Sequence, residues 1–137
     1  MTAAKVIFAC RHSAGRSQMA AAFFNAGVDP QKARAVAAGT EPAERVHPEV
    51  AAAMGEVGFD LSRARPQKLT AELAQDAGLL VTMGCGENCP YVPGLPVEDW
   101  ALDDPRGKPA AEVRRIHDQI RARVEQLIAR EGLGGKG

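Results

Sequence analysis

An α/β fold with a parallel sheet covered on both faces is predicted from three observations. Short apolar runs typical of buried strands alternate along the chain with longer segments of helical periodicity. Hydrophobic residues make up 45% of the chain and aromatic residues only 4%, so the core is aliphatic and alanine-rich. The length of 137 residues allows one domain with a substantial core and is too short for two.

The amino-terminal half is predicted to contain two strand–helix pairs. Val6–Ala9 is a short buried strand, and a helix over Ser17–Ala26 follows it until Gly27 ends it. Ala35–Ala38 is the second strand. A helix over Pro48–Val57 comes next and presents one apolar face.

The carboxyl-terminal half continues the alternation. Thr70 caps a short helix that runs to Ala77, Leu79–Met83 is the third strand, and Val97–Trp100 is a fourth short strand. Pro109 opens the last helix. Its apolar stripe consists of Val113, Ile116, Ile120, Val124 and Leu127.

Charge and composition narrow the classes of function. Lys+Arg and Asp+Glu are both 17, so bulk charge argues against binding to nucleic acid or to a membrane surface. No apolar run approaches the length of a membrane span and no signal segment is present, so a cytoplasmic protein is expected. Three cysteines in such a protein point to catalytic or redox use. The domain is expected over residues 1–131, with a flexible glycine-rich tail over 132–137.

A Cys-x5-Arg loop joins the first predicted strand to the first predicted helix. It reads Cys-Arg-His-Ser-Ala-Gly-Arg from Cys10 to Arg16, with Ser17 directly after it. The backbone N–H groups of such a loop point inward and the helix N-terminus adds partial positive charge, so the loop suits a tetrahedral oxyanion. The same field favours the thiolate form of Cys10, which is the attacking form.

Each residue of the Cys10–Arg16 loop has an expected role. Arg16 supplies a planar fork of donors for two anion oxygens, and Ser17 is close enough in sequence to donate its hydroxyl to the Cys10 sulfur. A buried structural cysteine beside a surface arginine is the competing interpretation, and the small residues inside the loop argue against it. The residues expected to line the anion site with Arg16 and Ser17 are Arg11, His12, Ser13, Ala14 and Gly15.

Cys85 and Cys89 form a Cys-x3-Cys pair in a glycine-flanked loop after the third predicted strand. Because parallel strands end at one sheet edge, this loop belongs at the same edge as Cys10. Three interpretations stay open: a metal site completed by Cys10 or His12, a redox relay, and two inert thiols. The relay is favoured because the glycines let the loop move, whereas a metal is not expected because no fourth ligand stands at a recognisable spacing.

Asp104 is the candidate general acid. Two carboxylates before a proline usually mark a turn or a helix cap, and Asp104 in that position can also protonate a leaving oxygen. His12 is either a second cation for the anion or a solvated side chain, and Trp100 is expected in the core. Cap or surface positions are expected for His47, Arg65, Lys68 and His117.

Together these motifs resemble the arsenate reductases built on the low-molecular-weight tyrosine phosphatase fold. The resemblance rests on Cys10–Met19, Thr82–Gly86 and Glu98–Pro105, and it covers nearly the whole chain. It implies a four-stranded parallel sheet flanked by helices and no cofactor. Shorter matching stretches are Gly39–Pro42, Val46–Pro48 and Asp60–Pro66.

The resemblance also implies a reaction, the reduction of arsenate to arsenite in arsenic detoxification. Arsenate would sit in the Cys10–Arg16 loop, Cys10 would attack arsenic, and Asp104 would protonate the departing hydroxide. Cys85 would then attack the Cys10 sulfur and release arsenite, and Cys89 would take over the disulfide by exchange. Thioredoxin, or a small thiol such as mycothiol or glutathione, would reduce the Cys85–Cys89 pair. Phosphate and sulfate are the competing oxyanions.

The chain departs from this family at the centre of the loop. Ser13 and Ala14 stand where the family commonly has Asn and Ser, and Ser13 is shorter than the Asn that usually braces the loop. Some relatives bind potassium with that Asn and three other side chains. The corresponding positions here are Ala21, Val36 and Arg65, so no potassium site is expected.

Two other functions would use the same residues. A phosphatase would use Cys10, Arg16 and Asp104, with water resolving a phosphocysteine. Arg106 follows the Asp-Pro, where phosphatases of this fold place aromatic residues, and they do not need a Cys-x3-Cys pair. A non-enzymatic arsenite or metal binder would instead use the soft thiolates of Cys10, Cys85 and Cys89.

Overall fold

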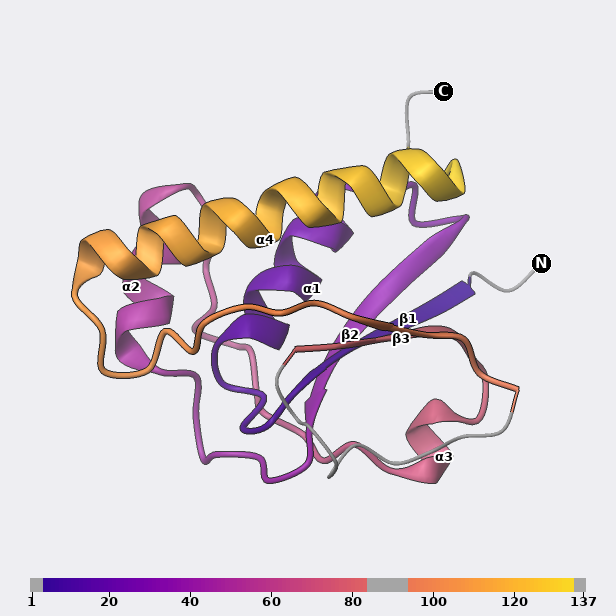
Figure 1. Cartoon of the computed structure of the whole chain (residues 1–137), viewed down its shortest axis with the longest axis horizontal. Helices are drawn as coiled ribbons and strands as arrows, with labels where there is room; N and C mark the ends of the chain where they lie inside the picture. Colours follow the sequence, from indigo (N-terminus) through magenta and orange to yellow (C-terminus); the bar gives the residue numbers. More distant parts are fainter. Residues whose placement is uncertain (1–3, 84–93, 135–137) are drawn as a thin grey trace.

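The computed structural model describes residues 4–83 and 94–134, and within them four parallel strands form one sheet in the order β2-β1-β3-β4 (Figure 1). The predicted four-stranded parallel sheet is therefore confirmed. The strands are β1 (Ala4–Cys10), β2 (Ala33–Gly39), β3 (Ala77–Thr82) and β4 (Val97–Asp99). The helices are α1 (Arg16–Gly27), α2 (Pro48–Glu56), α3 (Ala71–Ala74) and α4 (Ala110–Glu131).

β1 lies between β2 and β3, and its side chains are buried from Val6 to Cys10. A strand buried on both faces is encoded as a continuous apolar run, which this segment is. Its register places Cys10 beside Gly39 of β2 and Ala9 beside Thr82 of β3. Cys10 therefore stands at the carboxyl edge of the sheet, where ligands bind in folds of this class.

Helices cover both faces of the sheet unequally (Figure 1). α1, α2 and α4 share a core with Phe8, whose ring lies 5.7 Å from Phe24 of α1 and 5.6 Å from Trp100 between centroids. Trp100 is buried, as predicted. The short α3 and Leu69 cover the opposite face next to Ile7. Burial of apolar side chains on both faces, at roughly 25 cal/mol per Å², is the main favourable contribution to this fold.

α4 packs on α1 and α2 through the predicted apolar stripe, all of which is buried. His117 also lies in this interface, so its predicted solvated position is wrong. The side chain is 4% exposed, and its ring meets that of Phe23 on α1 at 6.2 Å between centroids. α4 buries a wider face than a minimal stripe because both α1 and α2 cover it. Neither α4 nor any other described helix is both long and apolar enough to span a membrane.

The chain continues in contact with the fold beyond α4. Gly132 has a φ of +67°, the left-handed conformation that glycine supplies at helix C-termini. The Leu133 carbonyl then accepts a 2.8 Å hydrogen bond from the Asp29 N–H, and Gly134 bridges to Val28. The structure thus differs from the expected tail at residues 132–134, which pair with the turn before β2. Residues 135–137 lie outside the described part.

Candidate active site

The Cys10 side chain lies at the floor of the loop that joins β1 to α1, and the residue is 2% exposed. Its sulfur is 3.2 Å from the Ser17 hydroxyl oxygen, to which the thiol donates a hydrogen bond. Once the thiol loses its proton, the same hydroxyl can turn and donate to the sulfur. The arrangement therefore supports Cys10 in both protonation states.

Four consecutive carbonyls of the Cys10–Arg16 loop, from residues 11–14, accept hydrogen bonds from groups outside the loop. One donor is the side-chain amide of Gln18, 2.8 Å from the Ser13 carbonyl oxygen. The other three are backbone N–H groups of the segment after β2, at distances of 2.7 to 2.9 Å, and belong to Glu41, Ala43 and His47.

The N–H groups of the same peptide units face the interior of the loop, because the C=O and N–H of a trans peptide point in opposite directions. Among the described residues, nothing accepts a hydrogen bond from the backbone N–H groups of residues 12–15. The N-terminus of α1 adds partial positive charge, and its first turn holds no acidic residue. The loop is therefore shaped and charged to hold an anion.

Arg16 is the first residue of α1, and only 8% of it is exposed. Its Nη1 donates to the Leu102 carbonyl at 3.1 Å, and its Nη2 lies 3.8 Å from Asp104 Oδ2. A guanidinium carries five N–H donors, so these two contacts leave donors for an anion in the loop. The buried cation is thus anchored on one side and available on the other.

Asp104 lies in the segment between β4 and α4. Its Oδ1 accepts a hydrogen bond from the Arg106 N–H at 3.0 Å, a turn that fixes the carboxylate beside Arg16. The neighbouring Asp103 is engaged elsewhere, because its Oδ2 lies 3.0 Å from Arg115 Nη2 on α4. The structure therefore brings Asp104, and not Asp103, to the Cys10–Arg16 loop.

Arg11 and His12 lie at the rim of the loop. The Arg11 side chain is exposed and pairs with Glu41, and its hydrogen bond lowers the pKa of that carboxyl group. The ring of His12 lies 6.3 Å from that of His47, the N-cap residue of α2, between centroids. Burial lowers the pKa of His47 and so favours its neutral form. His12, Glu41, His47 and Arg106 are among the residues that line a hollow of about 430 Å³ beside the loop.

Gln18 is a site residue that the sequence reasoning missed. It is 7% exposed, and its Nε2 lies 3.3 Å from the Arg65 carbonyl oxygen as well as 2.8 Å from that of Ser13. A signal was present in the sequence, because Gln18 is the one long polar side chain between Ser17 and Phe24. A buried amide in such an apolar segment needs partners, which the chain supplies from two loops.

Cys85 and Cys89 fall in residues 84–93, outside the described part of the chain, so their position relative to Cys10 is not given. The described chain reaches Met83, which is buried and whose N–H donates to the Ala9 carbonyl at 2.7 Å. The strand that precedes the cysteine pair thus ends next to Cys10. Among the described residues, no group of His, Cys, Asp or Glu side chains is arranged to hold a metal.

The three positions that the sequence analysis compared with potassium ligands do not offer side chains that suit this ion. Ala21, Val36 and Arg65 line a hollow of about 280 Å³ behind the loop, together with Gln18. The first two are apolar. The third carries a cationic side chain whose Nη1 donates to the carbonyls of Ser62 and Ala64. Hard cations need oxygen ligands, and these three side chains offer none.

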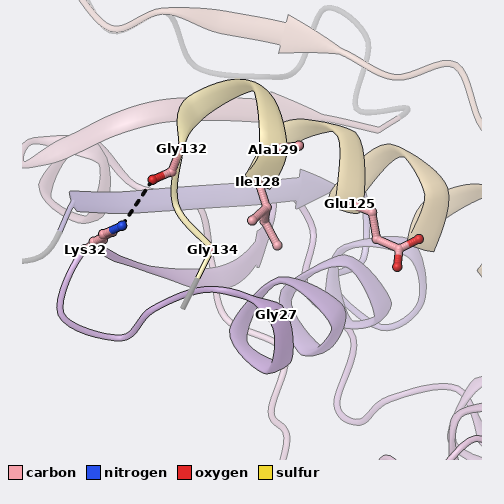
Figure 2. A pocket seen from close by; sticks show the side chains of 7 residues that line it. All are labelled: Gly27, Lys32, Glu125, Ile128, Ala129, Gly132 and Gly134. Carbon is pink, nitrogen blue, oxygen red and sulfur yellow. Dashed lines mark hydrogen bonds between the residues drawn. The ribbon is translucent and has the colours of Figure 1, made fainter. Parts of the chain in front are cut away.

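Another hollow, of about 420 Å³, lies at the opposite edge of the sheet between the carboxyl-terminal ends of α1 and α4 (Figure 2). Lys32 donates across it to the Gly132 carbonyl at 3.4 Å, and Ile128 and Glu125 line it. No thiol or hydroxyl group stands among the residues that line it, and the strands begin rather than end at this edge. We therefore identify the Cys10–Arg16 loop as the candidate site.

Comparison with known proteins identifies the family of this chain. A model of low molecular weight phosphotyrosine protein phosphatases matches residues 5–133. A glutaredoxin arsenate reductase of Synechocystis is 36% identical over 129 residues, covering 92% of this chain and 97% of that protein.

Two solved structures are also similar. A thioredoxin-dependent arsenate reductase of Corynebacterium glutamicum superposes with a TM-score of 0.79 at 33% identity. That match covers 93% of this chain and 61% of the other, so the chain spans less than two thirds of that protein. An arsenate reductase in its phosphate-binding state superposes with a TM-score of 0.75 at 33% identity, covering 93% of this chain and 98% of the other.

Proposed function

The chain belongs to the low molecular weight phosphotyrosine protein phosphatase family, and from this premise we propose that it is an enzyme that reduces arsenate to arsenite. One observation carries the proposal: a buried cysteine sulfur faces a loop whose inward N–H groups, buried Arg16 and helix N-terminus converge on it. Similarity to arsenate reductases at 33% to 36% identity favours arsenate as the oxyanion.

The substrate binds as a tetrahedral anion in the Cys10–Arg16 loop. The N–H groups of residues 12–15 and the free donors of Arg16 replace its hydration shell. These donors recognise charge and shape, so phosphate and sulfate compete with arsenate. The phosphate-binding state of a similar reductase supports this competition.

In the first chemical step the Cys10 thiolate attacks arsenic. A sulfur–arsenic bond forms, an arsenic–oxygen bond on the far side breaks, and the departing hydroxide takes a proton and leaves as water. Asp104 is the proposed proton donor, because its Oδ2 lies 3.8 Å from Arg16 Nη2 and so borders an anion that Arg16 holds. Ser17 stabilises the thiolate before the attack.

The reduction itself is proposed to use a thiol relay. The Cys85 thiolate attacks the Cys10 sulfur, the sulfur–arsenic bond breaks, and its electron pair leaves with arsenic as arsenite. Cys89 then attacks Cys85, which frees Cys10 and leaves a Cys85–Cys89 disulfide. Thioredoxin or a small thiol reduces that disulfide. Because the relay needs reduced thiols at rest, the proposed location is the cytoplasm.

Hydrolysis of a phosphate ester is the second candidate, since Cys10, Arg16 and Asp104 suffice to form and resolve a phosphocysteine. The match to a phosphatase family favours it. The hollow beside the loop argues against an aryl phosphate, because no Phe, Tyr or Trp stands among the described residues that line it. A free oxyanion suits this charged surface better than a phenyl ring does.

The test is arsenite release from arsenate under thioredoxin, thioredoxin reductase and NADPH, with Cys10→Ser and Cys89→Ser alongside. We expect NADPH consumption that requires arsenate and Cys10, and loss of turnover in Cys89→Ser. Consumption only with a small thiol would keep the reductase and change the donor. The phosphatase would be favoured if no electron donor supported arsenate reduction and if Cys10-dependent hydrolysis of a phosphate ester were retained in Cys89→Ser.

Arg115 is predicted to support Asp104 from α4. Its Nη2 lies 3.0 Å from Asp103 Oδ2 and 2.9 Å from Glu112 Oε2, which ties the Asp104 segment to the helix. Arg115→Gln should lower kcat for arsenate about threefold to tenfold and leave stability nearly unchanged, because exposed ion pairs contribute only about 0–1 kcal/mol.

Arg114→Gln is the matched control for Arg115→Gln in steady-state kinetics. Arg114 makes a comparable ion pair, 2.8 Å from Glu56 of α2, and within the described part of the chain it has no hydrogen bond or ion pair with the Asp104 segment. Its kcat should equal that of the wild type. Equal kcat values for the two variants would remove Arg115 from the support of Asp104.

A further inference from the structure

We propose that Gln18 is a positioning residue that holds the Cys10–Arg16 loop in its anion-binding conformation by linking it to the segment after α2. The inference rests on the proposed function only in that the loop binds an oxyanion. The buried amide of Gln18 would hold the loop in place, which neither the Cys10 thiol nor the Arg16 guanidinium does.

The amide of Gln18 makes contacts with two separate loops. Its Nε2 lies 2.8 Å from the Ser13 carbonyl oxygen, 3.4 Å from the Ser13 hydroxyl and 3.3 Å from the Arg65 carbonyl oxygen. An amide nitrogen has two hydrogens, so it can serve Ser13 and Arg65 at once. With 7% of the residue exposed, water has little access to replace either bond.

Ser13 is the loop position that most needs such support. Its φ of +52° is the only positive φ of a non-glycine residue in the described chain. The left-handed conformation costs such a residue about 1–2 kcal/mol. The carbonyls on either side of Ser13 are held by backbone donors, whereas the Ser13 carbonyl depends on a side chain.

Anchoring the Ser13 carbonyl also aims a donor at the anion. The Ser13 carbonyl and the Ala14 N–H belong to one peptide unit and point in opposite directions. With the carbonyl fixed on Gln18, the Ala14 N–H is directed into the loop. Loss of the amide would let this peptide unit rotate, which removes an anion donor and relieves the strain at Ser13.

A bound cation does not supply this support in the present chain. A cation behind the loop would have to bind in the hollow that Gln18, Ala21, Val36 and Arg65 line, where the last three offer no side-chain oxygen. The Gln18 nitrogen already occupies the space between the two carbonyls. Anion binding is therefore expected to be equal in potassium, sodium and choline chloride at the same ionic strength.

The primary test measures how inorganic phosphate protects Cys10 from iodoacetamide, with the Cys10 peptide quantified by mass spectrometry. Gln18→Met keeps the length of the side chain and removes the donor. It should weaken phosphate protection about tenfold, in line with the loss of one buried hydrogen-bond donor. The control Gln119→Met, on the exposed side of α4, should protect as the wild type does.

A rescue variant separates positioning from general stability. Ser13→Gly removes the penalty for a positive φ, so Ser13→Gly/Gln18→Met should regain most of the lost protection. If Gln18→Met does not fold, phosphate protection is compared between Ser13→Gly and Ser13→Gly/Gln18→Met instead. We expect the protection measured for these two variants to differ by less than threefold.

Three results would overturn the role of Gln18: wild-type protection in Gln18→Met, no recovery in the double variant, or protection that requires potassium. The assay needs no arsenate turnover. A chain that binds phosphate without reducing arsenate would contradict the proposed function and leave the Gln18 inference standing.

Discussion

Arg16→Lys is expected to lower kcat/KM for arsenate by about 10³-fold, the loss typical when a donor to transition-state charge is removed. Arg16 is almost buried, with Nη1 on the Leu102 carbonyl and Nη2 3.8 Å from Asp104 Oδ2. A lysine keeps the charge but presents a compact ammonium group, which cannot hold the Leu102 segment and two anion oxygens in one plane. The effect should fall on kcat and KM together.

Steady-state kinetics of Arg16→Lys should be read beside Arg34→Lys. Arg34 is an exposed residue of β2, and the same exchange there should leave kcat/KM unchanged. A loss in Arg16→Lys of less than tenfold would mean that charge alone suffices at this position. The planar, bidentate contact inferred for Arg16 would then be wrong.

The parts of this fold that were predictable are those encoded locally. β1 is a continuous apolar run because it is buried on both faces, and the loop and helix after it follow from Gly15 and from the periodicity of α1. The contact between Cys10 and Ser17 follows from the same local geometry. Local pattern and tertiary structure agree here, so the Cys10–Arg16 loop could be found from the sequence alone.

The parts that were missed depend on contacts between distant segments. His117 is a polar residue next to the apolar stripe of α4, and only the packing of α1 against α4 buries it against Phe23. Gln18 becomes a site residue because the segment around Arg65 returns to α1. Leu133 joins the fold because Asp29 lies within reach of its carbonyl. The spacing of His117 from Val113 and Ile120 does place it on the buried face of α4, and its polarity hid this position. No spacing within one element encodes the contacts of Gln18 and Leu133.

The choice between two adjacent carboxylates shows the same limit. From the sequence, only its place directly before Pro105 favours Asp104 over Asp103, and either residue suits a turn. In the structure Arg115 of α4 engages Asp103, whereas the Arg106 N–H turns Asp104 toward Arg16. The position of α4 separates the two carboxylates, so the tertiary structure supplies the physical reason for preferring Asp104 as the candidate acid, which the sequence supports only weakly.

Gly39→Ala is expected to disable the site from β2, with no change to any side chain that meets the anion. A Cβ at this position would lie 2.7 Å from both the Arg11 carbonyl oxygen and the Ser13 nitrogen, and 2.9 Å from the Cys10 carbonyl oxygen. These are backbone atoms, so the Cys10–Arg16 loop itself must shift. A misplacement of about 1 Å at a reacting centre costs about 10²-fold in rate, and we expect at least that loss in kcat/KM.

The same change should also destabilise the fold by about 1–3 kcal/mol, the usual cost of overpacking, in urea unfolding. Gly55→Ala is the matched control, because a Cβ there meets nothing within 4 Å and the residue lies in α2. It should raise stability by about 0.5–1 kcal/mol, as alanine does for glycine inside a helix, and leave the kinetics unchanged. If Gly39→Ala retained wild-type kcat/KM, the loop would tolerate displacement, and the tight backbone cradle inferred from its outward carbonyls would have to be abandoned. The two exchanges are expected to change stability in opposite directions. The same methyl group meets backbone atoms at Gly39 and open space at Gly55, so the comparison isolates the effect of the close backbone contact.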